Sequence, residues 1–254
     1  MRFAVFIPAR MASQRLPGKP LAELLGKPLI LHVCERARES GAELVLVATD
    51  DQRIHDICIT AGFRAEMTGA DHVSGTDRIA EVSSRLDWDE SDIVVNLQGD
   101  EPLMPAAVIR QVAELLDGRV DAQMATLCTP IHDLEEFLNP NVVKLVSDQA
   151  GNALYFSRAP IPWNREAAAA GLTSQQHWQG ALRHIGLYAY RIEALQQLAS
   201  AAPCELEQLE KLEQLRALWL GIKIAVDVAR EIPSPGVDTP EDLVRVADLL
   251  RKAP

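Results

Sequence analysis

The stretch that decides the fold is residues 1–20, MRFAVFIPARMASQRLPGKP, in which a short apolar run leads straight into a basic loop. The run is rich in β-forming side chains, as in a strand buried on both faces, and Pro8 is predicted to end it. The loop carries Arg10, Arg15 and Lys19 among small residues, which suits a polyphosphate held by backbone amides and cationic side chains. A solvated basic loop is the other interpretation. The phosphate is favoured, because ligands of open α/β sheets bind at the carboxyl ends of strands.

The composition is that of a globular chain. Of its 254 residues, 48% are hydrophobic and 24% are charged, which are ordinary values for a soluble protein. The length suits one large α/β domain or two small ones. The net charge of −11 argues against a nucleic-acid partner, whose binding surface would usually be basic. An anionic substrate would therefore need a local basic patch, which the first loop supplies.

The cysteines and the N-terminus indicate the compartment. Cys34, Cys58, Cys128 and Cys204 lie far apart and show no metal-binding spacing, so we expect reduced thiols. The N-terminal apolar run is broken at Pro8 and is too short for a signal peptide or a membrane span. We therefore expect a cytoplasmic protein without a membrane partner.

Strand-like and helix-like segments alternate through the first half of the chain. We expect strands at residues 2–7, 44–49 and 92–97, and helices at 28–40 and 52–61, around 79–86 and after Pro105. This order predicts the α/β class, with a Rossmann-like, mostly parallel central sheet that has helices on both faces and right-handed crossovers.

The second half is less regular. We expect strands at residues 125–131, 142–146, 153–156, 185–190 and 222–226. A hairpin-like turn at 148–152 predicts a smaller antiparallel region. Residues 165–180 are rich in Ala, Gln and Ser and are expected to form a surface loop or weak helix. Residues 205–220 predict one long helix, with a core stripe formed by Leu206, Leu209, Leu212 and Leu215.

A capping pattern predicts the start of the C-terminal helix. Thr239 is a good N-cap, Pro240 suits the first helical position, and Asp242 completes an approximate capping box. The sequence contains no internal repeat, low-complexity linker or clear domain boundary. We therefore predict a single domain over residues 1–254.

Three strands of the predicted sheet end in the polar residues Arg10, Asp50 and Asp100, which places a candidate site at one edge of the sheet. Asp100 stands just beyond a buried strand beside Gly99, a suitable place for a carboxylate that holds Mg²⁺. A turn-forming aspartate is an equally open interpretation. Asp238 is a second candidate ligand, but a carboxylate before a helix is also favoured by the helix dipole.

Other candidates remain undecided from the residues alone. Arg78 could grip an anion together with helix amides, or pair with Asp77 or Glu81. His184 by itself is more typical of a structural histidine, and Arg158 is equally undecided. Two polar residues lie off the leucine stripe and could face solvent or a polyol substrate; they are Glu213 and Gln214. The sequence contains no Gly-x-Gly-x-x-Gly, Walker, Gly-x-Ser-x-Gly or zinc motif, which argues against a dehydrogenase, a P-loop kinase and a serine hydrolase.

Blocks along nearly the whole chain resemble the 3-deoxy-manno-octulosonate cytidylyltransferase (CMP-Kdo synthetase) family, in that family's order. They are IPARMASQRLPGKPL, ADHVSGTDR, NLQGDEP, LYFSRAPIPW, RHIGLYAYR, LEQLR and GVDTPEDL. Together the blocks are specific, whereas looser versions of the first loop occur across nucleotidyltransferases. The departures are mild: Asp77 stands where Glu is also familiar, and residues 165–180 match poorly, which leaves open whether they form a lid.

The resemblance implies a nucleotidyltransferase fold and a transfer of CMP from CTP to the anomeric hydroxyl of Kdo. This reaction releases pyrophosphate and serves lipopolysaccharide synthesis. It also implies Mg²⁺ as cofactor and a homodimer formed through an antiparallel region at about residues 125–190. By resemblance, Arg10 and Lys19 hold the triphosphate and act in catalysis with Asp100. Ala9 and Ser74 also belong to the nucleotide pocket with Asp100, and Asp100 and Asp238 bind the metal. The sugar-binding residues implied are Arg78, Gln98, Arg158, His184, Tyr188, Glu213 and Gln214.

Two other functions stay open on the sequence. CMP-sialic acid synthetase also activates an acidic sugar with CTP, but it lacks this version of the first loop. A non-enzymatic nucleotide-binding module would explain the basic loop, although it gives no reason for the acidic loop at Asp100. Release of pyrophosphate separates an enzyme from a binding module, and the choice of sugar separates the two synthetases. No residue is assigned as a general base.

Overall fold

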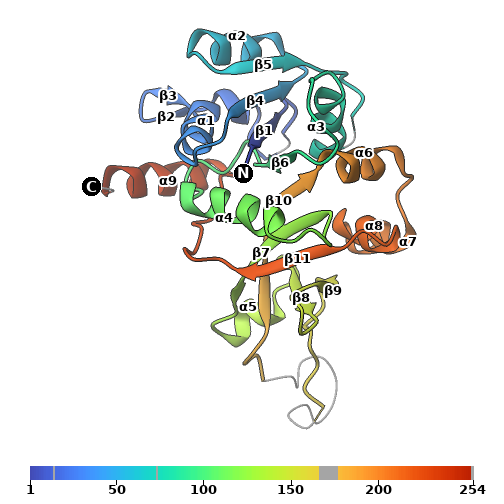
Figure 1. Ribbon diagram of the computed structural model, residues 1–254. Helices are drawn as coiled ribbons and strands as arrows, with labels where there is room; N and C mark the ends of the chain where they lie inside the picture. The colour runs from blue at the N-terminus through green and yellow to red at the C-terminus, as the bar shows by residue number, and fades with distance from the viewer. Residues whose placement is uncertain (14, 73, 166–176, 253–254) are drawn as a thin grey trace.

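The computed structural model describes residues 1–13, 15–72, 74–165 and 177–252. The loop expected at residues 165–180 falls largely outside the described residues. Within them, a nine-stranded sheet runs through the molecule, with helices against both faces (Figure 1). Its main path is β11 (Ile224–Val228), β7 (Met124–Pro130), β10 (Leu182–Arg191), β6 (Ile93–Asn96), β1 (Phe3–Ala9), β4 (Leu44–Thr49) and β5 (Arg64–Met67).

The first half of the sheet is parallel, as predicted. β1 lies between β4 and β6 and runs parallel to both, and every residue of β1 is buried. The prediction that Pro8 ends this strand is wrong, because β1 continues to Ala9 alongside β4. Pairing with β6 stops at Phe6, whose carbonyl accepts from the Leu97 amide. Pro8 is two residues further along on that same side, so its missing N–H costs no ladder hydrogen bond.

Side chains of β1 alternate between two cores. Phe3, Val5 and Ile7 pack with α1 (Leu29–Glu39) and α4 (Ala106–Asp117) on one face. Ala4 and Phe6 pack with α3 (Gly75–Ser83) and α6 (Ile192–Ser200) on the other. This period of two, on a strand without polar residues, is what a sheet covered on both faces requires. The predicted fold class is therefore confirmed.

The second half is antiparallel around β10, which pairs with β6 and β7 in that sense. The predicted hairpin is present, with β8 (Lys144–Ser147) and β9 (Ala153–Ser157) joined by residues 148–152. Together with the far end of β10, this hairpin extends as an arm away from the parallel half (Figure 1).

The single long helix predicted at residues 205–220 is wrong. Two short helices, α7 (Glu205–Glu210) and α8 (Gln214–Trp219), flank Lys211, whose φ is 54°. Leu209 is 72% exposed, so the leucine stripe is not a continuous core face. Arg216 explains the break, because it pairs with Glu207 at 2.7 Å across the bend and donates to two carbonyls at the end of α6. These bonds fold α8 back onto α6 and α7.

The remaining elements complete the outer layer. They are α2 (Gln52–Thr60), α5 (Leu134–Leu138), α9 (Pro240–Lys252), the 3₁₀ helix η1 (Lys19–Leu21) and the small pair β2 (Glu23–Leu24) and β3 (Lys27–Pro28). The capping box of α9 is confirmed, since Thr239 N donates to Asp242 Oδ2 at 3.0 Å and Asp242 N donates to Thr239 Oγ1 at 3.2 Å. None of the helices in the described part of the chain has the length and apolar character needed to cross a membrane.

Candidate active site

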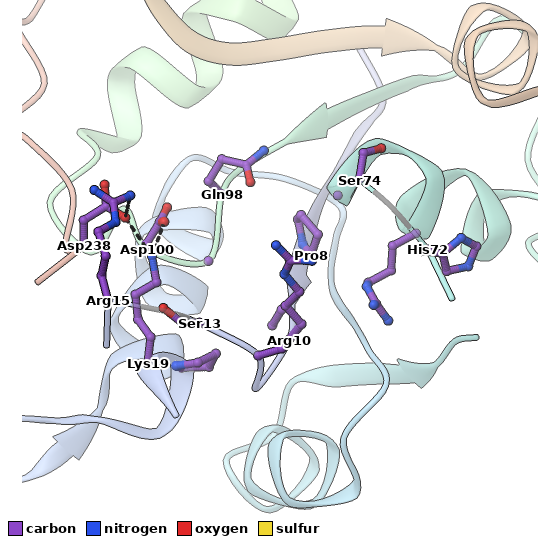
Figure 2. A pocket seen from close by; sticks show the side chains of 16 residues that line it. Pro8, Arg10, Ser13, Arg15, Lys19, His72, Ser74, Gln98, Asp100 and Asp238 are labelled. Atoms are coloured by element: carbon purple, nitrogen blue, oxygen red, sulfur yellow. Dashed lines mark hydrogen bonds and ion pairs between the residues drawn. The ribbon is translucent and has the colours of Figure 1, made fainter. Parts of the chain in front are cut away.

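A cavity of about 810 Å³ lies at the carboxyl ends of β1 and β6, beside the start of α3 (Figure 2). Its walls come from the loop after β1, the loop after β6 and the segment before α9. Among its lining residues are Ala9, Arg10, Lys19, Ser74, Arg78, Gln98, Asp100 and Asp238, all of them candidates from the sequence. Neighbouring parallel strands end at the same edge of the sheet, which is why residues so distant in sequence meet here.

Two glycines allow the loops to approach one another. A Cβ added at Gly99 would lie 2.9 Å from the carbonyl oxygen of Pro8, so a side chain there would push the loops after β1 and β6 apart. Gly18 has a φ of +70°, which turns the chain immediately before Lys19. Glycine reaches this left-handed conformation without strain, and the turn directs the η1 segment back toward the cavity.

Lys19 joins two carboxylates at one end of the cavity. Its Nζ lies 2.6 Å from Asp100 Oδ2 and 3.1 Å from Asp238 Oδ1 (Figure 2). Burial lowers the pKa of the Lys19 ammonium, but Asp100 and Asp238 outweigh that effect and hold the pKa above its ordinary value. The Val237 amide also donates to the Asp100 carbonyl at 2.8 Å, which fixes the two loops together. Two carboxylates from distant segments thus converge on a single positive charge.

Glu101 is a carboxyl of this cluster that the sequence analysis missed. Burial, followed by the nearby charges of Asp100 and Asp238, raises the pKa of Glu101 to about 8. The Glu101 side chain is therefore mostly protonated at neutral pH, which keeps a third negative charge away from the pair. Its position next to Asp100 in the QGDEP block could have indicated that Glu101 belongs to the site. The block does not show that the Glu101 side chain is buried.

Arg78 lines the cavity, but its guanidinium already forms an ion pair with another residue. Its Nη2 donates to Asp50 Oδ2 at 2.8 Å, and its Nη1 donates to the Gly69 carbonyl at 3.2 Å and to Thr68 Oγ1. Neither alternative partner proposed from the sequence is correct, because the ion pair is with Asp50 and not with Asp77 or Glu81. The Arg78 side chain is only 3% exposed and thus holds the end of β4 against α3.

A second cavity of about 260 Å³ adjoins the first through a shared residue. Gln98 lines both cavities. The second is also lined by His184, Tyr188, Glu213 and Gln214, which the resemblance assigned to one pocket with Gln98. Arg158 is not among the described residues that line either cavity. Its Nε donates to the Glu210 carbonyl at 2.7 Å, and its Nη1 donates to the Pro140 carbonyl at 2.9 Å.

The second cavity is lined by weakly charged hydrogen-bonding groups. Burial lowers the pKa of His184 to about 3, so its ring is neutral, and Nε2 lies 3.0 Å from Thr126 Oγ1. Burial, then Tyr190 and Glu213, raises the pKa of Tyr188. Among the described residues the Tyr188 hydroxyl has no hydrogen-bond partner although it is buried. A buried hydroxyl without a partner is costly unless a ligand supplies one.

Glu213 connects the two cavities. Its carboxylate accepts from Thr76 Oγ1 at 3.1 Å and from Ser74 Oγ at 3.4 Å, both at the start of α3. Burial raises the pKa of Glu213, while the bond from Thr76 opposes that shift. A ligand that moves Ser74 in the first cavity therefore acts directly on a wall of the second.

Comparison with known proteins extends these observations. A family profile described as Cytidylyltransferase matches residues 4–224. The chain is 56% identical over 251 residues to the 3-deoxy-manno-octulosonate cytidylyltransferase of Thioalkalivibrio sulfidiphilus, covering 99% of this chain and 100% of that protein. It is 55% identical to the protein of the same name from Alkalilimnicola ehrlichii, covering 98% and 96%.

Solved structures of cytidylyltransferases are also similar to this chain. CMP:2-keto-3-deoxy-manno-octonic acid synthetase, complexed with CTP, superimposes with a TM-score of 0.86 at 42% identity and covers 99% of each chain. A cytidylyltransferase from Leptospira borgpetersenii has a TM-score of 0.64 at 18% identity, covering 100% of this chain and 88% of that one, and so shares the fold.

Proposed function

The chain belongs to the 3-deoxy-manno-octulosonate cytidylyltransferase family, and from that premise we propose how its two cavities divide the reaction. The activity joins CMP from CTP to the sugar acid Kdo and forms CMP-Kdo. CTP occupies the larger cavity and Kdo the smaller one. The observation that carries this proposal is the meeting of the two cavities at Gln98, which brings the α-phosphate and the sugar hydroxyl to a common wall.

The basic loop binds the triphosphate in this proposal. Arg10, Arg15 and Lys19 all line the larger cavity and come from one short segment. Fixed cations are most effective where negative charge builds up, on the α-phosphate oxygens and on the departing pyrophosphate. Lys19 and Arg10 are therefore the residues that stabilise the transition state, and Ala9 and Ser74 form the walls beside them.

Asp100 and Asp238 are suited to hold Mg²⁺. Their oxygens already share one cation, the Lys19 ammonium, and carboxylates are the ligands that Mg²⁺ prefers. The described residues contain no cluster of three or more His, Cys, Asp or Glu that could hold a metal, so an ion on Asp100 and Asp238 would have to complete its shell with water and phosphate oxygens. When bound, Mg²⁺ supplies charge neutralisation and lowers the pKa of the attacking hydroxyl. Lys19 belongs to the phosphate-binding loop, and its ammonium lies between the two carboxylates. When Mg²⁺ occupies that position, the ammonium can donate to the phosphate oxygens instead.

Kdo is held mainly by hydrogen bonds. Gln98, Tyr188 and Gln214 offer donors and acceptors for sugar hydroxyls, and neutral His184 adds no charge. Glu213 is the carboxylate side chain on this cavity wall, so it is suited to accept from a hydroxyl. The resemblance assigns Arg78 and Arg158 to the sugar, but Arg78 lines the larger cavity and Arg158 lines neither among the described residues, so each would have to exchange a present partner to reach the Kdo carboxylate.

Pyrophosphate release tests the assignment. The purified protein is incubated with CTP, Mg²⁺ and a panel of acidic sugars that includes Kdo and sialic acid. We expect release with Kdo and little with sialic acid. Release without any sugar, or only with sialic acid, would contradict the assignment, and binding of CTP without release would identify a nucleotide-binding module.

Tyr188→Phe is expected to separate substrate binding from stability. Its hydroxyl has no partner among the described residues, so removal should leave the melting temperature unchanged or raise it. The KM for Kdo should rise by roughly three- to tenfold, the scale of one hydrogen bond. Calorimetric melting and initial rates at varied Kdo measure both effects. An unchanged KM with unchanged stability would remove Tyr188 from the sugar site.

We also propose that two copies pair through the antiparallel region at about residues 125–190, to which the β8–β9 hairpin belongs. We further propose that the protein works in the cytoplasm. Leu154 on β9 is 59% exposed and Trp163 is 41% exposed, and apolar surface of this kind is typical of an interface. The cysteines of the described chain are buried and free of disulfides, which fits a reducing compartment. Light scattering should give about twice the 27.9 kDa chain mass, and Leu154→Glu should lower it; a wild-type monomer would contradict the pairing.

A further inference from the structure

Five polar side chains of the smaller cavity form a connected network. They are Gln98, Asn96, Tyr190, Thr76 and Glu213, and all of them line that cavity. The three in the middle are buried, with exposed fractions between 2% and 4%. The network therefore runs from the loop after β6, across β10 and the start of α3, to the residue that precedes α8.

Both ends of this network are direct hydrogen bonds. Gln98 Nε2 donates to Asn96 Oδ1 at 3.2 Å, and Thr76 Oγ1 donates to Glu213 Oε2 at 3.1 Å. Tyr190 completes the middle. Burial and then Glu213 raise the pKa of Tyr190, and hydrogen bonds with the side chains of Thr76 and Asn96 oppose that shift. The Tyr190 hydroxyl thus keeps its hydrogen at neutral pH and lies between the two bonded pairs.

Strand pairing places Asn96 beside Tyr190. Asn96 on β6 is opposite Tyr188 on β10 in the antiparallel register. Tyr190 lies two residues further along β10, so its side chain is on the same face of the sheet and diagonal to Asn96, a separation that an aromatic side chain can span. The sheet, and not a loop, therefore sets the positions of both residues.

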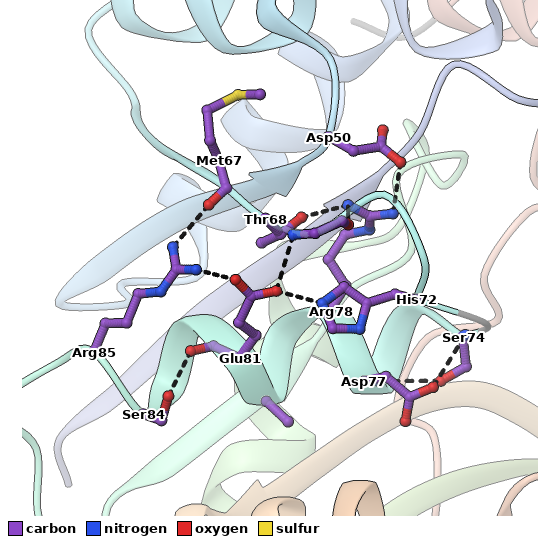
Figure 3. Close-up of polar contacts among 12 residues, drawn as sticks. Asp50, Met67, Thr68, His72, Ser74, Asp77, Arg78, Glu81, Ser84 and Arg85 are labelled. Atoms are coloured by element: carbon purple, nitrogen blue, oxygen red, sulfur yellow. Dashed lines mark hydrogen bonds and ion pairs between the residues drawn. The ribbon is translucent and has the colours of Figure 1, made fainter.

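A capping box fixes the other half of the network at the start of α3. Ser74 Oγ accepts the Asp77 amide at 3.1 Å, and Asp77 Oδ2 accepts the Ser74 amide at 3.2 Å (Figure 3). Thr76 lies in this first turn, which directs its hydroxyl toward Glu213. The Arg216 guanidinium lies 3.8 Å from Glu213 Oε1 and, with Thr76, opposes the rise that burial gives to the pKa of this carboxyl. In the ionised form that Arg216 favours, Glu213 accepts hydrogen bonds and donates none.

The acceptor at this end sets the direction of every bond in the network. Because Thr76 gives its hydrogen to Glu213, its oxygen can meet Tyr190 only as an acceptor. Tyr190 then donates to Thr76 and accepts from the amide nitrogen of Asn96. The Asn96 oxygen is left to accept from Gln98 Nε2, which is the bond that the structure has. The donors and acceptors of all five groups therefore agree in one direction, from Gln98 to Glu213.

This direction leaves the Gln98 oxygen as an acceptor at the wall that the two cavities share. A Cβ placed on Gly75 would lie 3.6 Å from Gln98 Oε1, so the oxygen faces the start of α3, where Gly75 lines the larger cavity. A hydroxyl that attacks the α-phosphorus must point a lone pair at phosphorus and donate its hydrogen bond elsewhere. A carbonyl oxygen at the wall accepts that hydrogen bond, whereas an NH₂ group there would donate to the attacking oxygen and occupy the lone pair.

We propose that Asn96, Tyr190 and Thr76 are positioning residues that fix the Gln98 amide with its oxygen toward the attacking hydroxyl of Kdo. They act through Gln98 and touch neither reacting atom. The observation that carries this proposal is the common direction of the Gln98–Asn96 and Thr76–Glu213 bonds. It rests on the proposed function, which places CTP and Kdo on the two sides of Gln98.

A double-mutant cycle between Tyr190 and Gln98 tests the network, because no hydrogen bond joins these two side chains directly in the described part of the chain. At saturating CTP, Tyr190→Phe should lower kcat/KM for Kdo by roughly two- to tenfold, the scale of one buried hydrogen bond. Gln98→Met should lower it by at least as much. In the Gln98→Met background, Tyr190→Phe should have no further effect, because both changes act on one acceptor. Losses that multiply would show a merely structural role for Tyr190 and overturn the proposal, as would a loss below about 1.5-fold from Tyr190→Phe alone.

The two substitutions of Thr76 separate its hydroxyl from its shape. Thr76→Val keeps the shape and should lose at least as much kcat/KM as Tyr190→Phe, whereas Thr76→Ser keeps the hydroxyl and should retain most of it. The opposite ranking would mean that Thr76 only packs, and would overturn its assignment. Thr129→Val is the matched control. Thr129 is buried on β7 and is not among the described residues that line either cavity, so kcat/KM should stay unchanged.

Nitrogen-15 NMR of the ligand-free protein observes the Gln98 amide without turnover. Its NH₂ signals are the pair that disappears in Gln98→Met. They should shift in Tyr190→Phe and stay in place in Thr129→Val; signals that Tyr190→Phe leaves in place would overturn the proposal. Failure of the proposed function would instead appear as protein in which these shifts occur but wild type releases no pyrophosphate from CTP with Kdo.

Discussion

Asp100→Asn is expected to lower kcat by at least about a hundredfold at fixed Mg²⁺, the scale of losing one preorganised charge partner. Asparagine has nearly the same shape, so the fold should survive while one negative charge disappears from the pair that Lys19 joins. Raised metal concentration or Mn²⁺ should restore part of the activity. Initial rates over a metal titration measure the effect.

Asp238→Asn should behave in the same way if both carboxylates hold one ion. The double variant should then lose much less than the product of the two single losses, because residues that act through one ion are not additive. Wild-type protein should lose its activity in EDTA. Full turnover in metal-free buffer would contradict the metal assignment of both residues.

The structure also weakens the alternative role of Asp238 at the helix terminus. Thr239 and Asp242 already form the capping box of α9, and Asp242 Oδ2 accepts the Asp238 amide at 3.0 Å. Asp242→Asn is therefore the matched control. It should lower stability by about 0.5–2 kcal/mol with near-normal turnover, as expected for a lost cap. An Asp238→Asn protein that melts early but turns over normally would leave Asp100 as the sole proposed ligand.

Lys19→Ala is expected to slow turnover by a factor on the order of 10² to 10³, because it removes a fixed donor to developing negative charge. The KM for Kdo should change far less, since Lys19 does not line the smaller cavity among the described residues. Without metal the variant should also melt earlier, as Asp100 and Asp238 then repel each other with no cation between them. Steady-state kinetics and melting with and without Mg²⁺ measure both effects.

The control for Lys19→Ala is Lys27→Ala. Lys27 belongs to the same stretch of chain but pairs with Glu35 outside the larger cavity. Its loss should leave kcat unchanged. If Lys19→Ala slows turnover by less than about threefold, which is well under 1 kcal/mol, Lys19 is not part of the catalytic charge arrangement.

The parallel half of the fold could be predicted from the sequence because its strands are buried on both faces and therefore appear as continuous apolar runs. Residues 44–49 were predicted as a strand with the bounds that β4 has. The prediction that Pro8 ends the first strand was wrong because a missing N–H costs a hydrogen bond only where a paired strand would accept it. The sequence of one strand does not show which of its residues are paired on that side. The break at Lys211 was hidden for a related reason: the leucine spacing fits one helix, and the pairing of Arg216 with Glu207 across the bend needs the folded chain.

The site was predictable where sheet geometry alone creates it. Arg10 and Asp100 follow neighbouring strands, so their meeting at one edge could be expected. The family resemblance placed Asp238 beside Asp100, but the contact of Asp238 with Lys19 depends on a long return of the chain and was not predicted. The partner of Arg78 was missed because Asp50, at the end of β4, and Arg78 become neighbours only when α3 packs against β1 and β4.

We predict that this chain joins CMP to Kdo only when a divalent metal ion is present. Phosphorus NMR of a single mixture of protein, CTP, Kdo and Mg²⁺ tests it most directly. We predict that the triphosphate signals give way to equal amounts of pyrophosphate and a CMP sugar diester, and that EDTA prevents both. Products limited to CDP with phosphate, or free CMP with no diester at any time, would contradict the claim.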